Sequence, residues 1–267
     1  MNVEPIRFSW LKNFARSPAH AKAELDNPRA PTRAMDLGAI AHRIILGPRP
    51  GDGELAIWTG EQRRGKVWDA FVEEYAGDVI VRAKDFNIAK KIAAAVQADE
   101  TAAGLLDAAR CEVPLAWEEA GFKCETRGID ILRPARGEPG FSIWELKSTT
   151  NVEPEKLKRH AMQMLYPQQL EFYRGGLEAR GAGPCREAGI IAVEVTPPHV
   201  VTCLTLTPAL LAWARKSLVL WLERCRICLN DNHWPGFAQR PVDFDVPPWL
   251  AEVPDEEEPE GEEDDAA

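Results

Sequence analysis

Apolar residues in the first hundred positions recur at intervals of three and four, the spacing of one face of an α-helix. This spacing predicts helices over 9–14, from 18 onward, over 32–46, and near 61–75 and 84–98. Ser17-Pro18 is a typical helix start, and Gly47-Pro48 is a typical stop. Only 78–82 in this region reads as a short strand, so the N-terminal part is expected to be helical.

The period changes to two in the middle of the chain, where short β-rich runs are separated by Gly and Pro turns. The expected elements are strands at 111–117, 123–133 and 141–149, a helix over 167–179, strands at 188–195 and 199–206, and a helix over 208–230. Thr207-Pro208 supplies a cap and a first position for the last helix. This order predicts an α/β fold, a central mixed β-sheet flanked by helices, behind the helical N-terminal region.

Charge divides the 267 residues into a body and a tail. Segment 251–267 carries ten Asp or Glu and no Lys or Arg, so it accounts for the net charge of −10 and the remaining residues balance. A run of like charge repels itself and cannot bury a core. We therefore expect one domain over 1–250, with a helical part at 1–105 and a core with its closing helix at 106–230. An acidic disordered tail follows at 251–267.

Membrane and secreted classes do not fit the sequence. No uncharged apolar run reaches the roughly 18–20 residues that a membrane span needs, and the opening MNVEPIRFSW lacks the features of a signal peptide. We expect a cytoplasmic protein with no membrane partner and with six reduced cysteines. Cys225 and Cys228 form a CxxC pair, but their helical setting predicts thiols that face the core rather than a metal.

Candidate chemistry lies in two of the expected strands. Asp130 stands in the apolar run GIDILRP, and Glu145 and Lys147 alternate with apolar residues in FSIWELKSTT. The period of a strand puts Glu145 and Lys147 on one face. Two carboxylates and a lysine on adjacent strands suit a hard divalent cation such as Mg²⁺, which prefers carboxylates, waters and phosphate oxygens. The lysine could then orient or deprotonate a water and offset phosphate charge.

Each of these signals, taken alone, also has a plainer interpretation. Glu145-Leu146-Lys147 could be an ordinary ion pair at a strand end, and burying both charges is costly unless they are paired or serve a site. Gln169 and Tyr173 share a helical face and could donate to phosphate, or be a solvated Gln and a packed Tyr. His42 could contact metal or phosphate, or simply be packed. Glu112 reads first as a polar residue at a strand edge.

Three motifs resemble, in their order along the chain, the active-site motifs of PD-(D/E)XK nucleases: Asp130, Glu145-Leu146-Lys147 and Gln169-x-x-x-Tyr173. More narrowly, the chain is similar to the RecB and lambda-exonuclease branch and to the RecE-like phage exonucleases in it. The similar segments are SWLKNFARSPAHAKAELDNP, MDLGAIAHRIILGP, EVPLAWEEAGFKCETRGIDIL and QQLEFYRGGL, which span about 7–230. The resemblance implies the restriction-endonuclease-like core, a mixed sheet between helices.

The resemblance also implies a role for each site residue. Asp130 and Glu145 would hold the metal together with the main-chain carbonyl of Leu146, and Lys147 would activate the attacking water. The remaining matches are His42 near the metal, Gln169 and Tyr173 orienting lysine, water or phosphate, and Glu112, more loosely, near a second metal. Mg²⁺ is the expected ion, with Mn²⁺ as the alternative. The family's iron–sulfur members carry a cysteine upstream of the core, and no cysteine precedes Cys111 here, so no iron–sulfur cluster is expected.

By the same resemblance, we expect an exonuclease that digests linear double-stranded DNA from 5′ ends in phage-type recombination. The implied partners are DNA ends, a single-strand annealing protein and further copies of the chain in a ring-forming trimer or tetramer. Two alternatives stay open, an endonuclease on the same core and a non-catalytic DNA-binding module. Basic segments at 63–66 and 156–160 could contact DNA or be solvated helix faces. The acidic tail could compete with DNA for them.

Overall fold

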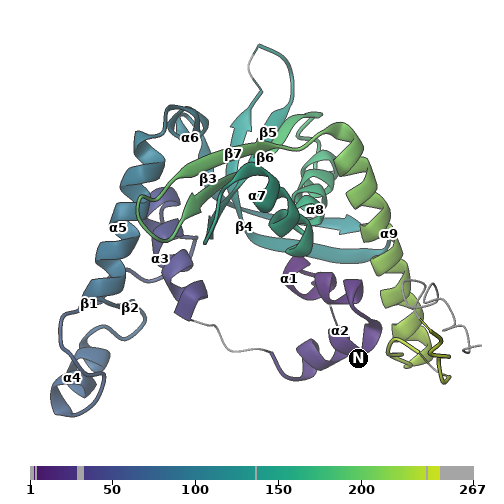
Figure 1. The fold of residues 1–267 in the computed structure, drawn as a ribbon, viewed down its shortest axis with the longest axis horizontal. Helices are drawn as coiled ribbons and strands as arrows, with labels where there is room; N and C mark the ends of the chain where they lie inside the picture. The colour runs from purple at the N-terminus through teal and green to yellow at the C-terminus, as the bar shows by residue number, and fades with distance from the viewer. Residues whose placement is uncertain (1–2, 4, 29–32, 136, 239, 247–267) are drawn as a thin grey trace, which may run out of the picture.

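The computed structural model describes residues 3, 5–28, 33–135, 137–238 and 240–246. A five-stranded sheet forms its centre (Figure 1). The strands are β3 (Arg110–Glu119), β4 (Phe122–Pro134), β5 (Phe141–Thr149), β6 (Cys185–Glu194) and β7 (Val201–Thr205). They lie side by side in chain order, and every pair is antiparallel except β5 and β6, which run parallel. The predicted mixed sheet is therefore confirmed.

Helices cover both faces of this sheet, which gives it two apolar cores. One face carries α1 (Phe8–Leu11), α2 (Pro18–Asp26), α7 (Pro154–Gln163), α8 (Tyr166–Ala179) and α9 (Pro208–Asp231). The other face carries α3 (Arg33–Leu46), α5 (Ala83–Ala98) and α6 (Glu100–Leu106).

Strand β5 divides its side chains between the two cores. Ile143 packs in the core that contains α8, whereas Trp144 and Leu146 pack in the core that contains α3. Because side chains alternate along a strand, Glu145 and Lys147 fall on the same face as Ile143. This arrangement agrees with the face predicted for them from sequence.

A smaller unit extends from the N-terminal end of α5, away from the main sheet (Figure 1). It consists of β1 (Leu55–Trp58), α4 (Lys66–Glu74) and β2 (Val79–Arg82), with the two strands paired in parallel. The Trp58 ring centroid lies 5.1 Å from that of Trp68 and 5.0 Å from that of Phe71. Strand β2, with three consecutive β-branched residues at 79–81, was predicted, but β1 was not, because Ile57 is its only β-branched residue.

Most other predicted elements are present with small shifts in their ends. Ser17 and Thr207 act as the predicted N-caps, since their hydroxyl oxygens accept from the backbone N–H groups of His20 and Leu210. The first predicted helix is α1 followed by a 3-10 turn at Lys12–Ala15. Helix α7 was not predicted. Only Leu157 and Ala161 of its ten residues are buried, which is too sparse an apolar pattern to recognise.

All six cysteines are free thiols, and Cys225 and Cys228 are buried on α9, as their helical setting predicted. Within the described ranges, no helix is both long enough and apolar enough to cross a membrane. The predicted acidic tail at 251–267 lies outside the described residues.

Candidate active site

Asp130 lies where β4 and β5 stop pairing. The last registered pair of these strands is Ile131 and Trp144. Asp130 comes immediately before Ile131 in β4, and its Oδ2 accepts a hydrogen bond from the backbone N–H of Leu146 at 2.8 Å. The side chain of Asp130 thus replaces a strand-to-strand hydrogen bond, and Asp130 is buried between the two strands.

Glu145 and Lys147 form an ion pair at this point of β5. Nζ of Lys147 lies 2.6 Å from Oε2 of Glu145, and the Glu145 side chain is almost fully buried. Burial raises the pKa of Glu145 to about 8, and the negative charge of Asp130 acts in the same direction. Burial alone would lower the pKa of Lys147, but Glu145 and Asp130 outweigh it and raise that pKa above its ordinary value.

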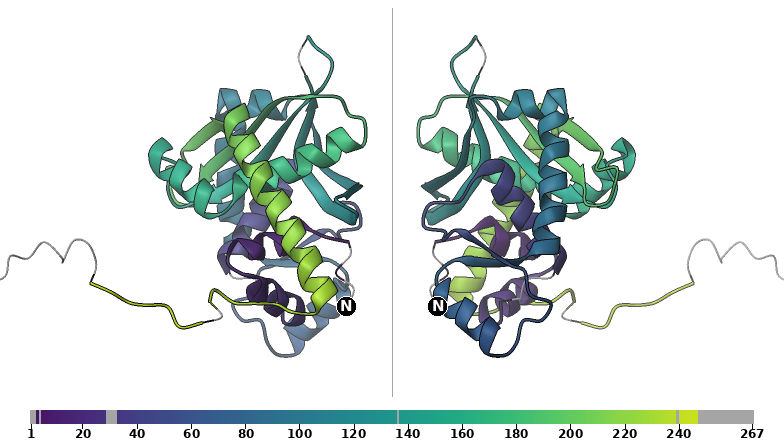
Figure 2. Two further views of the ribbon diagram at one scale, coloured as in Figure 1. Left: turned by 90° about the vertical axis from the view of Figure 1, so that its right-hand side faces the viewer. Right: turned by 90° about the vertical axis from the view of Figure 1, so that its left-hand side faces the viewer.

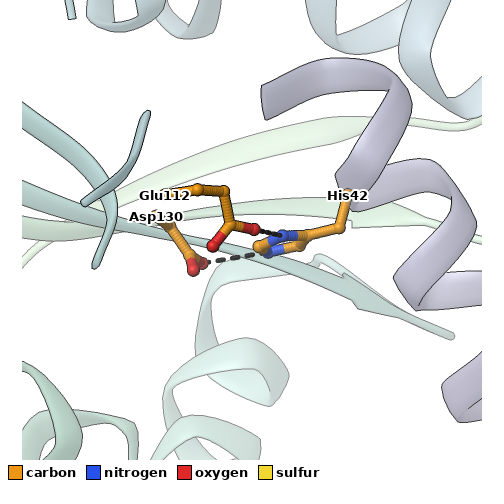
Figure 3. Close-up of side chains that lie close together, drawn as sticks. All are labelled: His42, Glu112 and Asp130. Atoms are coloured by element: carbon orange, nitrogen blue, oxygen red, sulfur yellow. Dashed lines mark hydrogen bonds and ion pairs between the residues drawn. The ribbon is translucent and has the colours of Figure 1, made fainter. Parts of the chain in front are cut away.

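His42 reaches this pair of strands from α3 (Figure 3). Its Nε2 lies 3.0 Å from Oδ2 of Asp130 and 3.0 Å from the carbonyl oxygen of Leu146, and its Nδ1 lies 3.2 Å from Oε1 of Glu112. Burial would lower the pKa of His42, but these two carboxylates raise it to about 10. Without a metal, the imidazolium therefore donates from both ring nitrogens.

A glycine brings α3 close enough to the sheet for His42 to reach these partners. Gly38 lies one helical turn before His42, and a Cβ at this position would lie 2.8 Å from Oγ of Ser148 at the end of β5. Ile40 and Ala41 of the same helix are buried in the core below. The small residue and the apolar neighbours together set the depth of the histidine.

Glu112 occupies a special position on β3. Its φ is +51°, and it stands beside the irregularity at which the β3–β4 register shifts. Gly128 of β4 leaves the space for its side chain, because a Cβ there would lie 2.1 Å from Oε2 of Glu112. β3 is an edge strand, as the plainer interpretation expected. Nevertheless, the Glu112 side chain is only 4% exposed and points at His42 (Figure 3).

Two residues that the sequence analysis missed complete the surroundings. Nε of Arg49 donates to Oε2 of Glu112 at 2.7 Å, on the side away from His42. The Tyr166 ring centroid lies 5.1 Å from Nζ of Lys147, a cation–π contact. Tyr166 begins α8 after the left-handed Leu165, with a φ of +62°. The signal in the sequence that could have identified Tyr166 is its position one helical turn before Gln169.

Gln169 and Tyr173 lie on α8 and contact each other. Nε2 of Gln169 donates to the Tyr173 hydroxyl at 3.3 Å. Burial raises the pKa of Tyr173 to about 12, and the nearby charge of Glu145 adds to the effect. Both side chains therefore stay neutral donors at ordinary pH.

All eight sequence-predicted site residues line one cavity of about 1310 Å³. They are His42, Glu112, Asp130, Glu145, Leu146, Lys147, Gln169 and Tyr173. The two basic segments reach the same cavity, through Arg63 of one and His160 of the other. Further basic residues in its wall are Arg7, Lys12, Arg43, Arg49, Arg82 and Arg127. The wall also carries Asp36, Asp52, Asp85 and Glu125, of which Asp52 and Glu125 pair with its arginines. An open cavity of this size has room for a large ligand, and its basic side chains favour an anionic one.

The donor atoms at the centre of this cavity fit a divalent cation. One ligand atom from each of His42, Glu112 and Asp130 lies within 4.8 Å of the others. Oε1 of Glu145 is buried and has no hydrogen-bond partner among the described residues. A buried, unpartnered carboxylate oxygen is costly, and a hard cation would satisfy it. Carboxylate and carbonyl oxygens favour Mg²⁺ or Mn²⁺.

The comparisons with known proteins bear on this geometry. The sequence model of the family described as a PDDEXK-like domain of unknown function (DUF3799) matches residues 7–240. Among solved structures, a protein from Eubacterium rectale named as a putative exonuclease is 13% identical. The match covers 93% of this chain and 92% of that chain, with a TM-score of 0.59, and shows a shared fold.

A second solved structure, that of SSO0001, is 11% identical and covers 82% of this chain and 78% of that chain. Its TM-score of 0.33 is too low to support a common fold. No curated protein matches the sequence.

Proposed function

We propose that this chain, which belongs to the PDDEXK-like family just described, is a metal-dependent nuclease that hydrolyses DNA phosphodiester bonds. The observation that carries the proposal is the meeting of Asp130, Glu145 and Lys147 with His42 in one open cavity whose wall also carries arginines. An ion pair between Glu145 and Lys147 with a purely structural role would not require the buried carboxylates of Asp130 and Glu112 and the histidine beside them.

The residues that would hold the metal are His42, Asp130, Glu145 and the Leu146 carbonyl. Mg²⁺, or Mn²⁺ in its place, would supply a Lewis acid and a water of lowered pKa when bound. Glu112 contacts His42 on the side away from Asp130. It therefore fixes the histidine ring, as carboxylates do for many metal-binding histidines.

Lys147 would act on the reacting groups directly. Glu145 and the Tyr166 ring hold its ammonium in place, so that little reorganisation is needed when negative charge develops on a phosphate. Its raised pKa keeps it cationic, which suits charge stabilisation and orientation of a water through its N–H groups. Gln169 and Tyr173, both neutral donors that line the same cavity, would hold phosphate oxygens.

We favour exonucleolytic digestion of linear double-stranded DNA from 5′ ends, in phage-type recombination. The support is the resemblance of 9–28, of 35–48 and of the strand motifs to RecE-like exonucleases. The protein from Eubacterium rectale that shares the fold is named as a putative exonuclease, which agrees with this proposal. A single-strand annealing protein and a ring of three or four copies belong to the same proposal.

Digestion of linear and of covalently closed circular duplex DNA in Mg²⁺ separates the alternatives. Loss of the linear substrate alone supports an exonuclease, and the 5′- or 3′-labelled strand that disappears first gives the polarity. Cutting of the circle supports an endonuclease. DNA binding with no hydrolysis of linear, circular or branched substrates, in Mg²⁺ or in Mn²⁺, overturns the proposal in favour of a binding module.

A further inference from the structure

The small unit formed by β1, α4 and β2 turns only basic side chains toward the cavity of the candidate active site. We call residues 55–82 the β1–β2 unit, and the structure describes all of them. The unit carries five Asp or Glu and four Lys or Arg. Of these charged residues, only Arg63 and Arg82 line the cavity. A unit whose own charge is nearly balanced therefore presents positive charge to the space in which a substrate would lie.

Two acidic residues of the same wall flank this unit in sequence. Asp52 precedes it, and its carboxylate lies 4.0 Å from Nη1 of Arg43 and 3.6 Å from Nη2 of Arg127. Asp85 follows it, in the first turn of α5. Among the described residues, neither carboxylate forms an ion pair with Arg63. The charge of Arg63 is therefore not cancelled by its neighbours in the wall.

Two contacts from its own unit hold Arg63 in the loop before α4. Nη2 of Arg63 donates a hydrogen bond to the carbonyl oxygen of Ile80 in β2 at 3.1 Å. Its Cζ lies 5.4 Å from the centroid of the Trp68 ring, a cation–π contact. The residue is exposed. Because a guanidinium has five N–H donors, most of them remain available to a ligand.

The aromatic residues of the unit form a platform under this arginine. The Trp68 ring centroid lies 5.1 Å from that of Trp58 and 6.4 Å from that of Phe71, and the rings of Trp68 and Phe71 are nearly parallel. The Phe71 centroid lies 4.5 Å from that of Tyr75. No residue of α4 is buried, so these ring contacts hold the helix in place. A side chain stacked on such a platform loses less conformational entropy when it binds a ligand.

We propose that Arg63 binds a backbone phosphate of the DNA substrate, at a nucleotide other than the one that is cleaved. This assignment rests on the proposed nuclease function. The metal-binding residues lie on β3, β4, β5 and α3, whereas the β1–β2 unit lies beside the lower end of α5, apart from the strands of the main sheet (Figure 1; Figure 2, right). Arginine binds phosphate through paired N–H groups, and such contacts do not read base sequence. The unit therefore holds the duplex without selecting its sequence.

The salt dependence of DNA binding tests this contact, with Arg64 as the matched control. Arg64 is also exposed, but its Nε donates to Oε1 of Gln62 at 2.7 Å, and it does not line the cavity. Fluorescence anisotropy of a labelled linear duplex in EDTA, which prevents cleavage, gives the affinity at several salt concentrations. Arg63→Ala is expected to bind about tenfold more weakly. It should also lower the slope of log affinity against log salt by about one, whereas Arg64→Ala keeps the wild-type slope.

Steady-state digestion of the same duplex in Mg²⁺ gives a second readout. A phosphate away from the scissile bond is held equally in the ground state and the transition state, so Arg63→Ala should raise KM with kcat little changed. A fall in kcat at constant KM would overturn the assignment, because it would place Arg63 at the scissile phosphate. An Arg63→Ala protein with the salt slope and KM of the wild type would overturn this assignment alone. A wild type that neither binds nor digests the duplex would overturn the proposed function as well.

Discussion

Asp130 and Leu146 are tied by a side-chain to backbone hydrogen bond of 2.8 Å at the point where β4 and β5 stop pairing. The carbonyl of the same Leu146 accepts from His42, which also contacts Asp130. The backbone of one residue of β5 therefore fixes both the carboxylate and the imidazole. This link explains how side chains from β4, β5 and α3 share one metal-sized space.

Asp130→Asn is expected to weaken Mn²⁺ or Mg²⁺ binding by about a hundredfold or more, because an anionic ligand is lost. The amide oxygen can still accept from Leu146, so the fold is retained. Isothermal titration with Mn²⁺ measures the change. Asp52→Asn is the control, since Asp52 lines the same cavity outside the metal cluster. Equal affinity in the two variants would contradict the assignment.

Gly128→Ala is expected to push Glu112 away from His42, since the new Cβ would overlap Oε2 of Glu112. We expect a loss of about 1–3 kcal/mol in the free energy of unfolding and lower nuclease activity. Gly104→Ala in α6 is the control, because nothing lies within 4 Å of its Cβ position. It should be neutral or stabilising by up to about 1 kcal/mol. Chemical denaturation and nuclease assays of both variants provide the comparison. A Gly128→Ala protein with the stability and activity of the Gly104→Ala control would contradict the expected clash with Glu112.

Tyr166→Phe is expected to keep the cation–π contact with Lys147 and near-normal activity, whereas Tyr166→Leu removes it. The loss should appear as a kcat about tenfold lower with KM little changed, since the contact orients a group that acts in the transition state. Steady-state digestion of a linear duplex measures both constants. A Tyr166→Phe variant as impaired as Tyr166→Leu would instead assign the effect to the hydroxyl group.

Without metal, the stability of the fold should fall as pH rises from about 6 to 10. The pKa of His42 is raised to about 10 and that of Glu145 to about 8. Each proton is therefore held more tightly in the folded state than in the unfolded state, and this stabilisation disappears as the folded groups deprotonate. A cation competes with the His42 proton, so the rise in melting temperature caused by Mg²⁺ should grow with pH.

Melting temperatures in EDTA and in Mg²⁺ across this interval test the expectation. His42→Gln should flatten the metal-free profile, because it removes one of the two titrating groups. A metal-free protein that becomes more stable with rising pH would contradict the arrangement of charges described for the site.

The sequence predicted the parts of the site that depend on local period. Alternation along one strand put Glu145 and Lys147 on one face, and helical spacing placed Gln169 beside Tyr173; both are observed. The order of these motifs, rather than any one of them, identified the family.

The contacts between distant segments could not be predicted in this way. Arg49 meets Glu112 only because the chain after α3 passes the edge of β3. Glu112 turns inward because its φ is +51° beside a register shift, and no residue pattern announces such an irregularity. Tyr166 reaches Lys147 through a left-handed turn after α7, a helix whose weak apolar pattern hid it.

The most direct test is Mg²⁺-dependent release of nucleotides from linear duplex DNA, compared between the wild type and Lys147→Ala. Lys91→Ala serves as a control, since Lys91 is exposed on α5 and does not line the cavity. We predict hydrolysis by the wild type and the control, its loss in EDTA, and a fall of about a hundredfold or more in Lys147→Ala. Hydrolysis by Lys147→Ala at the wild-type rate would contradict the assignment of this site.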